Sequence, residues 1–528
     1  MIEGKQIIGF ELVAQGQEDF ASVNPSTGEN LSYRFKKATK EEVNKAVEKA
    51  AAAFQVYRKK SGKEKAAFLE KIADEIKALG DELVTLCMTE TALPKGRIEG
   101  ERDRTANQLK LFASLLREGS WLDARIETAI PDRAPLPKAD IRYMEIGLGP
   151  VVVFGASNFP LAFSAAGGDT ASALAAGCPV IVKAHGAHPA TSELVAKAIQ
   201  KAAKETGMPD GVYSLLHGDG RVVGTLLVKH PEVKAVGFTG SFAGGKALFD
   251  AAVAREVPIP VYAEMGSTNP VFILPGAMQE RSEKIAQGFS SSVSLGVGQF
   301  CTNPGILIYE NGNGAKGFTQ QLETEFQKTS GGPMLAESIF NAYTKGVAHH
   351  TATKGMEILA QGGKSEGVNT ASPILFKTTG EVFSANPELA EEIFGPASVL
   401  VETTSKEEVL SIAKNLSGHL TATVHGTEKD LADYKELFDI LEQKVGRIVI
   451  NGYPTGVEVC HAMVHGGPFP STTDGRSTSV GTAAIHRFTR PVSYQGMPQS
   501  LLPDELKNEN PSGIWRLVNG ERTKNAIQ

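Results

Sequence analysis

The chain has little cysteine: among its 528 residues there are only Cys87, Cys178, Cys301 and Cys460. No Cys-x-x-Cys pair is present, which excludes the common structural zinc motifs, and we predict no metal site. Four thiols at irregular spacing also argue against a disulfide framework and favour a reducing compartment. We therefore expect a cytoplasmic protein.

Long apolar runs and an excess of positive charge are also missing. No stretch approaches the ~20 apolar residues that a membrane helix requires. The first residues, Met1 to Lys5, show no basic segment followed by an apolar run, so we expect neither a membrane span nor a signal peptide. The net charge of −6 argues against nucleic-acid binding as the main function. The length predicts two or three globular domains.

The pattern of apolar residues changes near residue 150. Before this point, helical spacing predicts helices within 40–85 and 102–116, and a strand-like run follows the Pro-rich segment 129–137. After it, short β-branched runs alternate with helical stretches. The expected strands lie at 151–154, 180–182, 212–216 and 235–238, and the expected helices at 161–176, 189–204 and 222–228. Such alternation is typical of a doubly wound parallel sheet, whose ligands bind at the carboxyl ends of its strands.

Three glycine-rich runs each carry one reactive side chain. They are Gly155-Ala156-Ser157-Asn158-Phe159-Pro160, Ala263-Glu264-Met265-Gly266-Ser267-Thr268-Asn269-Pro270 and Gly298-Gln299-Phe300-Cys301-Thr302-Asn303-Pro304-Gly305. Alone, Cys301 would be read as a buried apolar thiol, Glu264 as a surface carboxylate and Asn158 as a turn residue. Together they suggest covalent catalysis on a carbonyl. Burial at a strand end would raise the pKa of Glu264 toward the range of a general base.

Two further glycine motifs are weaker. The run from Gly240 to Lys246 nearly matches a phosphate-binding P-loop, but Ala247 stands where a hydroxyl should bind magnesium, so ATP hydrolysis ranks last. A helix N-terminus that faces a pyrophosphate fits this run better. Gly218-Asp219-Gly220 begins like a dinucleotide fingerprint whose third glycine is displaced to Gly224. Both motifs could also be tight turns between a strand and a helix.

Taken together, the three reactive runs resemble the aldehyde dehydrogenase superfamily. The resemblance extends from Asn24-Pro25-Ser26-Thr27-Gly28-Glu29 to Glu391-Glu392-Ile393-Phe394-Gly395-Pro396. It implies an α/β fold with a Rossmann-type doubly wound parallel sheet domain, a second α/β catalytic domain and a β-strand oligomerisation arm. The expected ranges are 1–121 and 147–265 for NAD(P) binding, 266–480 for the domain with the cysteine nucleophile, and 122–146 and 481–528 for the arm and tail. We expect a homodimer or homotetramer.

The resemblance also implies roles for single residues. Cys301 would attack the aldehyde to give a thiohemiacetal, hydride transfer to the nicotinamide would leave a thioester, and Glu264 would activate the water that releases the acid. Asn158 and the Cys301 N–H would stabilise the oxyanion. The expected cofactor contacts are Lys183 and Glu392 for the two riboses, Phe394 in the run of Glu392, and Gly240, Ser241 and Gly245 for the pyrophosphate.

NADP is the expected cofactor, with NAD tolerated. Family members that prefer NAD often carry an acid three positions after the lysine, and Gly186 stands there. Arg221 could pair with the 2′-phosphate of NADP through its guanidinium fork. The alternative is that Arg221 is an ordinary solvated surface charge.

The expected substrate is 2,5-dioxopentanoate (α-ketoglutarate semialdehyde), oxidised to 2-oxoglutarate in sugar-acid, pentose or hydroxyproline catabolism. The runs 158–177 and 475–481 resemble the subgroup that contains NADP-dependent 2,5-dioxovalerate dehydrogenases and a bacterial NADP-dependent fatty aldehyde dehydrogenase. The expected substrate contacts are Arg104, Gln108, Phe163 and Arg476. Both arginines could instead be solvated or ion-paired, and an apolar tunnel lined by phenylalanines would favour fatty aldehydes. A CoA-acylating relative would lack the base at Glu264, and a catalytically silent binding protein would not need the three reactive residues.

Overall fold

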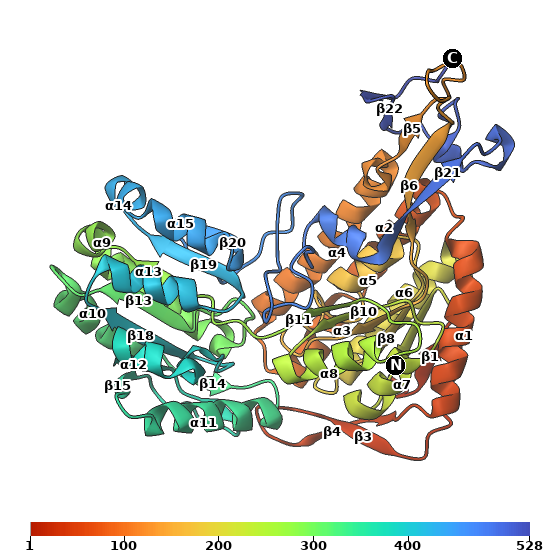
Figure 1. Ribbon diagram of the computed structural model, residues 1–528. Coiled ribbons are helices and arrows are strands. Elements are labelled where there is room, and N and C mark those ends of the chain that lie inside the picture. The colour runs from red at the N-terminus through yellow and green to blue at the C-terminus, as the bar shows by residue number, and fades with distance from the viewer. Residues whose placement is uncertain (1) are drawn as a thin grey trace.

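Two seven-stranded sheets, each covered by helices, and a projecting arm make up the computed structural model, which describes residues 2–528 (Figure 1). The first sheet has the spatial order β11 (Val261–Glu264), β10 (Ala235–Thr239), β7 (Val151–Phe154), β8 (Val180–Lys183), β9 (Tyr213–Leu216), β1 (Gln6–Ile8) and β2 (Glu11–Val13). The strands from β11 to β9 are parallel, and β1 and β2 are antiparallel additions. The chain winds outward from β7 to β9 and then returns to the other side of β7, which creates a topological switch point there.

Helices of the first unit cover its sheet. They are α1 (Lys40–Tyr57), α2 (Gly62–Ala78), α3 (Gly80–Thr91), α4 (Lys95–Glu118), α5 (Gly168–Ala175), α6 (Pro189–Glu205), α7 (Thr225–Lys229) and α8 (Phe242–Val253). α1 and α2 begin at Thr39 and Ser61, each of which forms a capping box with the glutamate three residues later; such boxes satisfy the free N–H groups of the first turn. The apolar faces predicted within 40–85 are buried as expected.

Two predicted helices of this unit differ from the structure. The range 161–176 begins with a turn, and α5 starts only at Gly168, because Gly167 is extended with φ −75° and ψ −165°. The range 222–228 is a single π-helical turn, Gly220–Gly224, followed by α7. In the segment 161–176, small apolar residues suggested a continuous helix. The turn at its start instead places Phe159 and Phe163 in one apolar cluster.

The second unit has the strand order β15 (Glu357–Gln361), β17 (Ile374–Thr379), β18 (Ala397–Thr403), β13 (Ile306–Glu310), β12 (Val271–Ile273), β19 (His419–His425) and β20 (Val445–Ile450). All neighbours except β15 are parallel. Its helices are α9 (Pro275–Ser294), α10 (Ala315–Lys328), α11 (Glu337–Ala352), α12 (Gly380–Ala385), α13 (Lys406–Asn415), α14 (Glu428–Asp433) and α15 (Lys435–Leu441), and β14 (Gly332–Pro333) pairs with β16 (Thr370–Ala371).

The arm joins segments from distant parts of the chain in one five-stranded sheet. Its order is β21 (Thr489–Gln495), β6 (Ile141–Gly147), β5 (Arg125–Glu127), β22 (Arg516–Val518) and β23 (Glu521–Thr523), and it projects from the first unit (Figure 1). The segment 482–488 forms a 3-10 helix, so the arm strand β21 begins only at Thr489. A hairpin of β3 (Asp19–Val23) and β4 (Asn30–Lys36) precedes α1.

The predicted α/β class with parallel sheets is confirmed, whereas the expected domain boundaries stay a prediction. Within residues 2–528, no helix combines the length and the apolar character that a membrane crossing requires.

Candidate active site

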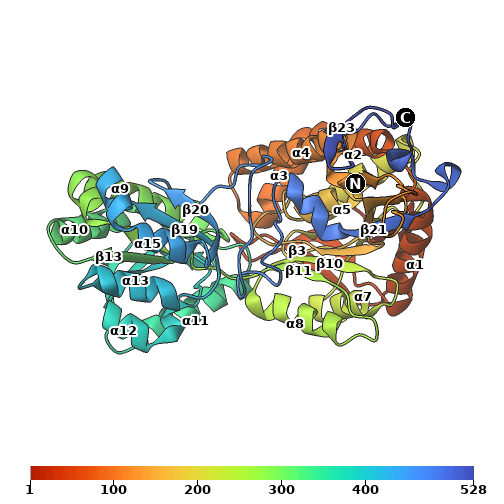
Figure 2. The ribbon, with the colours of Figure 1, turned by 45° about the horizontal axis from the view of Figure 1, so that its top comes forward.

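Strand β11 lies on the side of the first unit that faces the second unit (Figure 2). Glu264 is the last residue of β11 and Asn158 follows β7, so both lie at the carboxyl ends of the first sheet. Cys301 precedes β13, at the amino ends of the second sheet. Parallel strands bring their ends to a common edge, and the switch point of such a sheet is the expected place for a ligand.

His465 connects the thiol and the carboxylate. Its Nε2 lies 3.4 Å from Cys301 Sγ and 2.9 Å from Glu264 Oε1. The imidazole and the carboxylate are each 1% exposed, so water competes little for these contacts. The Ser479 hydroxyl donates a hydrogen bond of 3.0 Å to the other carboxylate oxygen, Oε2. One imidazole nitrogen therefore reaches both groups that the chemistry requires.

The expectation that burial raises the pKa of Glu264 is wrong for this arrangement. Burial does act to raise it, but the His465, Cys301 and Ser479 contacts stabilise the carboxylate and lower its pKa below the usual value. The pKa of the Cys301 thiol, in contrast, is raised well above its usual value by burial and by the negative charge of Glu264. At rest the pair is therefore a thiol beside a carboxylate.

A segment after β20 holds this cluster in place. Around residue 472 it runs antiparallel to the end of β11: Met265 N–H donates to the Ser471 carbonyl at 2.7 Å and Thr473 N–H to the Ala263 carbonyl at 3.1 Å. The same segment supplies His465 and Ser479. Neither residue was predicted as part of the site. Ser479 lies in the run 475–481 and His465 begins the run His465-Gly466-Gly467-Pro468, but nothing in either run indicates Glu264 as a neighbour.

Amide side chains shape the loop that carries the thiol. Asn158 Nδ2 donates to the Gln299 carbonyl at 3.1 Å, and Asn269 Nδ2 donates to the Cys301 carbonyl at 2.9 Å. Gly298 has φ +66°, and a side-chain carbon there would lie 2.2 Å from the backbone of Gly395, so only glycine fits. The Cys301 N–H has no acceptor among residues 2–528. Asn158 and this N–H are thus two donors at the loop that carries the thiol.

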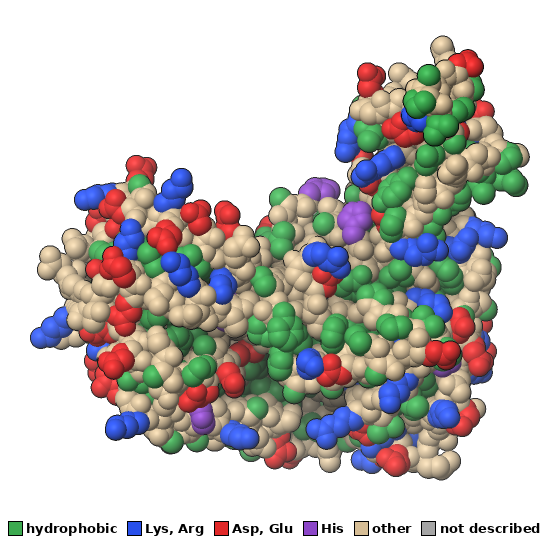
Figure 3. Space-filling view, viewed as in Figure 1, with side chains coloured by type: hydrophobic (Ala, Val, Ile, Leu, Met, Phe, Trp, Pro, Cys, Tyr) green, Lys and Arg blue, Asp and Glu red, His purple; other side chains and the backbone are tan. Residues whose placement is uncertain are grey.

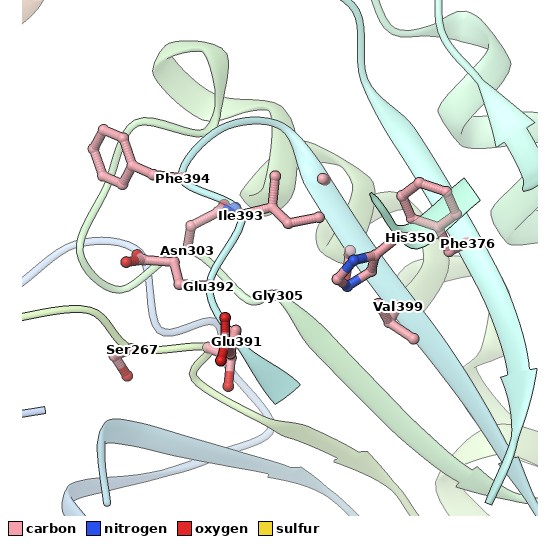
Figure 4. A pocket seen from close by; sticks show the side chains of 13 residues that line it. Ser267, Asn303, Gly305, His350, Phe376, Glu391, Glu392, Ile393, Phe394 and Val399 are labelled. Carbon is pink, nitrogen blue, oxygen red and sulfur yellow. The ribbon is translucent and has the colours of Figure 1, made fainter. Parts of the chain in front are cut away.

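Glu392 and Phe394 line a small pocket whose lining residues all follow β11. Figure 4 shows Glu392 on the same side of it as Ser267 and Asn303. Burial raises the pKa of Glu392 to about 8, although the Ser267 N–H donates to it. A side-chain carbon at Gly266 would lie 2.7 Å from Glu392 Oε2, so this glycine leaves room for the carboxylate. Ser267, which replaces a glycine of the family pattern, bonds through its hydroxyl to Asn269 and Leu420.

The residues expected to hold a nicotinamide cofactor fit that group. Lys183 ends β8 and is 9% exposed, yet its ammonium has no hydrogen bond or ion pair within residues 2–528. Burial lowers its pKa to about 8, so hydroxyl acceptors from a ribose would satisfy a costly unpaired group. Ser241 is the N-cap of α8. A side-chain carbon at Gly245 would lie 2.7 Å from Met265, so glycine at this position lets the start of α8 pack close to the end of β11.

Gly186 and Arg221 border the same strand ends. A side-chain carbon at Gly186 would meet no atom within 4 Å. Arg221 is exposed on the π-helical turn, which contacts the end of β8. Nearby Asp219 is paired with Lys37 at 3.0 Å, so its charge is compensated.

Arg104 and Gln108 project from α4 toward an aromatic cluster. The Arg104 guanidinium lies 5.6 Å from the Phe159 ring centroid and 5.3 Å from that of Phe163. Arg104 Nε and Gln108 Nε2 are buried with no hydrogen-bond partner. Arg97 is different, since it pairs with Glu101 at 3.4 Å and donates to the Asn158 carbonyl.

Arg476 is not brought to this site. Its side chain is 93% exposed and pairs with Asp474 at 3.1 Å. Within residues 2–528 it makes no contact with the groups around Cys301, so the structure does not support its expected role as a substrate anchor. The loop motif suggested proximity, but the arginine points into solvent.

Comparisons with known proteins agree with the geometry. The aldehyde dehydrogenase family model matches residues 12–493. The chain is 50% identical to alpha-ketoglutaric semialdehyde dehydrogenase 2 of Azospirillum brasilense, covering 98% of this chain and 99% of that one. It is 46% identical to alpha-ketoglutaric semialdehyde dehydrogenase of Acinetobacter baylyi, covering 99% of each chain. The fold is similar to that of a Bacillus cereus aldehyde dehydrogenase in an NAD+ complex, with a TM-score of 0.80, 23% identity, and coverage of 93% of this chain and 96% of that chain.

Proposed function

Since the chain belongs to the aldehyde dehydrogenase family, we propose that it oxidises 2,5-dioxopentanoate to 2-oxoglutarate, with NADP as the preferred cofactor. Family membership makes it an aldehyde-oxidising oxidoreductase that uses a nicotinamide cofactor. The substrate is proposed from the two relatives, both alpha-ketoglutaric semialdehyde dehydrogenases, and from one observation in the site. That observation is the half-buried Arg104 beside the aromatic cluster, which forms no ion pair within residues 2–528 and whose buried Nε has no hydrogen-bond partner there.

His465 is placed to move the thiol proton. Because the pKa of Cys301 is raised, the sulfur must lose its proton before it can attack a carbonyl carbon. In the tautomer that carries its hydrogen on Nδ1, His465 can accept this proton from Sγ at Nε2 and then pass it to Glu264 Oε1, since the same nitrogen lies near both atoms. The thiolate then forms the carbon–sulfur bond, and the carbonyl oxygen becomes an oxyanion. Asn158 Nδ2 and the Cys301 N–H are the donors available to that oxygen.

The second half of the reaction uses the carboxylate again. When bound, the nicotinamide ring serves as the hydride acceptor of the reaction, and Lys183, Glu392 and the start of α8 would hold its dinucleotide. The thioester on Cys301 must then be hydrolysed. Once the proton taken up in the first half has left Glu264 for solvent, the carboxylate can take a proton from the attacking water, with Ser479 holding its Oε2 in place. The acid leaves and the thiolate of Cys301 is restored.

The substrate carboxylate is the proposed partner of Arg104 and Gln108. A carboxylate accepts hydrogen bonds from a guanidinium and an amide, the groups that lack acceptors here. Burial lowers the pKa of Arg104, which reflects the cost of leaving its charge without a partner. An anion would remove this cost. A long alkyl chain would leave both groups unsatisfied.

The alternative is a fatty aldehyde dehydrogenase. Phe159, Phe163 and Phe300 pack together with Val480, and such an apolar cluster could also hold an alkyl chain. The two functions differ in what they require of Arg104. Removal of Arg104 should strengthen binding of an alkyl chain, whereas it should abolish binding of a substrate carboxylate.

The experiment is a comparison of kcat/KM for 2,5-dioxopentanoate, hexanal and dodecanal, each with NADP and with NAD. We expect the dioxo acid to exceed both alkanals by at least tenfold, about 1.4 kcal/mol in transition-state binding. A preference for dodecanal would replace the proposal with the fatty-aldehyde function. No activity with any of the three would contradict both.

Oligomer formation through the arm is part of this proposal. The arm exposes large apolar side chains, Ile130 at 45% and Leu136 at 70%, and Figure 3 shows hydrophobic side chains over the arm. An exposed apolar surface of this kind favours burial against another subunit. Sedimentation velocity should give a dimer or tetramer, and a strictly monomeric protein would contradict this part.

A further inference from the structure

A second cleft lies at the foot of the arm, away from Cys301. It has a volume of about 650 Å³ and is bounded by the link between α1 and α2, the end of α4, β6 and the tail after Tyr494. Such a volume suits a small organic ligand. Figure 3 shows basic side chains on this part of the molecule. Six basic residues line it: Arg58, Lys59, Lys60, Lys63, Lys65 and Arg117.

Most of these basic side chains form no ion pair within residues 2–528. Lys60 pairs with Glu64 and Arg117 pairs with Glu70, but the other four form no ion pair. The lining carboxylates are fewer, namely Glu145, Asp504 and Glu505, and Asp504 is paired with Lys507. The cleft therefore carries an excess of unpaired positive charge.

Lys65 is the unusual member of this set. It is only 6% exposed, yet its ammonium forms no hydrogen bond or ion pair within residues 2–528; its neighbours are the Tyr57 ring, with the centroid 5.9 Å away, and Gly177. Burial lowers its pKa, and the more distant Glu505 opposes this only in part. A buried ammonium without a partner costs free energy that a bound anion would recover.

The start of α2 adds further donors. Ser61 and Gly62 line the same cleft, and α2 has 17 residues, so the positive end of its dipole lies there. The capping box occupies the N–H of Glu64, which leaves the N–H groups of Gly62 and Lys63 available to an anion. Apolar contacts come from Phe54, Trp121 and Tyr494.

We propose that this cleft binds a small organic anion with at least two negative charges, as carboxylates or phosphates, and that its occupancy changes the affinity for the aldehyde. Two helices link the cleft to the active site. α4 lines the cleft at Leu116 and carries Arg104 twelve residues earlier, about 18 Å along a helix. α5 ends next to Ala176 of the cleft and begins at Gly168, where a side-chain carbon would lie 3.3 Å from Gln108 Nε2.

Citrate and inorganic pyrophosphate are suitable probes, one for each anion chemistry. Both are titrated calorimetrically into the full-length protein saturated with NADP, so that the cofactor site is filled. We expect one binding event per chain for the preferred anion, and Lys65→Met should weaken it at least tenfold, because methionine keeps the volume and removes the charge. Arg104→Met should bind as the wild type does, which separates this cleft from the active site.

Several results would overturn the proposal. One is that neither anion binds to the wild type. Another is that the preferred anion binds equally well to the wild type and to Lys65→Met. If a second copy of the chain fills the cleft, neither anion binds and Lys65→Met changes the sedimentation coefficient, which also contradicts the proposal. Should Lys65→Met fold poorly, the exposed pair Arg58→Ala and Lys59→Ala gives the same test with a several-fold loss expected. A KM for the aldehyde that stays constant at saturating anion would overturn the regulatory part.

Discussion

The polar groups around Cys301 form two sets. Those behind the sulfur find their hydrogen-bond partners within the protein, whereas those in front of it, on the side of the expected substrate, do not. Behind the sulfur, His465, Glu264 and Ser479 contact one another at 2.9 to 3.0 Å. In front, Arg104 Nε and Gln108 Nε2 are buried without a hydrogen-bond partner among residues 2–528. Groups whose geometry is already fixed suit bond-making steps, whereas unpaired groups are set up to receive a ligand. Changes behind the sulfur should therefore lower kcat, and changes in front should alter KM and selectivity.

The largest effect should follow removal of the nucleophile. Cys301→Ala leaves no group that can form the thioester, and we expect a loss of at least ~10⁴-fold in kcat. Cofactor reduction in the presence of each aldehyde measures this. Cys460→Ala, another partly exposed free thiol, is the matched control and should retain full activity. An active Cys301→Ala protein would contradict the covalent mechanism.

His465→Gln tests the proton path. Glutamine can donate a hydrogen bond but cannot carry the thiol proton, so kcat should fall by ~10²–10⁴-fold, the usual contribution of acid–base catalysis. The control is His461→Gln, because His461 is exposed and contacts only Thr482 within residues 2–528. Equal losses in the two variants would show that the effect is not specific to the proton path.

The pH profile gives the same test without a mutation. Burial and Glu264 raise the pKa of Cys301, so the thiolate fraction grows as the pH rises, and kcat/KM should increase with pH in the wild type. Loss of His465 should make this increase steeper, because hydroxide must then replace the missing base. A pH-independent kcat/KM would mean that thiol ionisation does not limit the reaction.

Arg104→Met tests the unpaired side of the comparison. We expect kcat/KM for 2,5-dioxopentanoate to fall about 10- to 100-fold, the range for loss of a charge-assisted hydrogen bond of ~1.5–3 kcal/mol. The value for hexanal should hold or rise. Stability should not fall, because a half-buried charge without an ion pair in the described part of the chain is replaced by an apolar side chain. Lys110→Met, on the solvent side of α4 and paired with Asp74, should change neither substrate; a parallel loss for hexanal would argue against a carboxylate anchor.

The same contrast explains how far the sequence could predict this molecule. Alternating β-branched runs predicted the parallel strands β7 to β10, since buried strands need continuous apolar character. Cys301, Glu264 and Asn158 could be selected as candidate reactive residues because each follows or precedes a strand in a glycine-rich run. His465 was not, because its role depends on the packing of the segment 462–481 against β11, a contact between residues 200 positions apart. The lowered pKa of Glu264 was missed for the same reason.

The smallest effect concerns cofactor choice at Arg221. If this exposed arginine pairs with the 2′-phosphate of NADP, Arg221→Ala should raise KM for NADP about three- to tenfold and leave that for NAD unchanged, because solvent-exposed ion pairs contribute only ~0.2–1 kcal/mol and charge-assisted forks somewhat more. The loss should shrink at high salt, as screening weakens exposed charge pairs. Lys37→Ala sharpens the test: it frees Asp219 from its partner, and an uncompensated carboxylate beside Arg221 should disfavour NADP further. If Arg221→Ala leaves the ratio of KM for NADP to KM for NAD unchanged, Arg221 does not select NADP. Gly186, which allows NADP without selecting it, would then be the basis of cofactor choice.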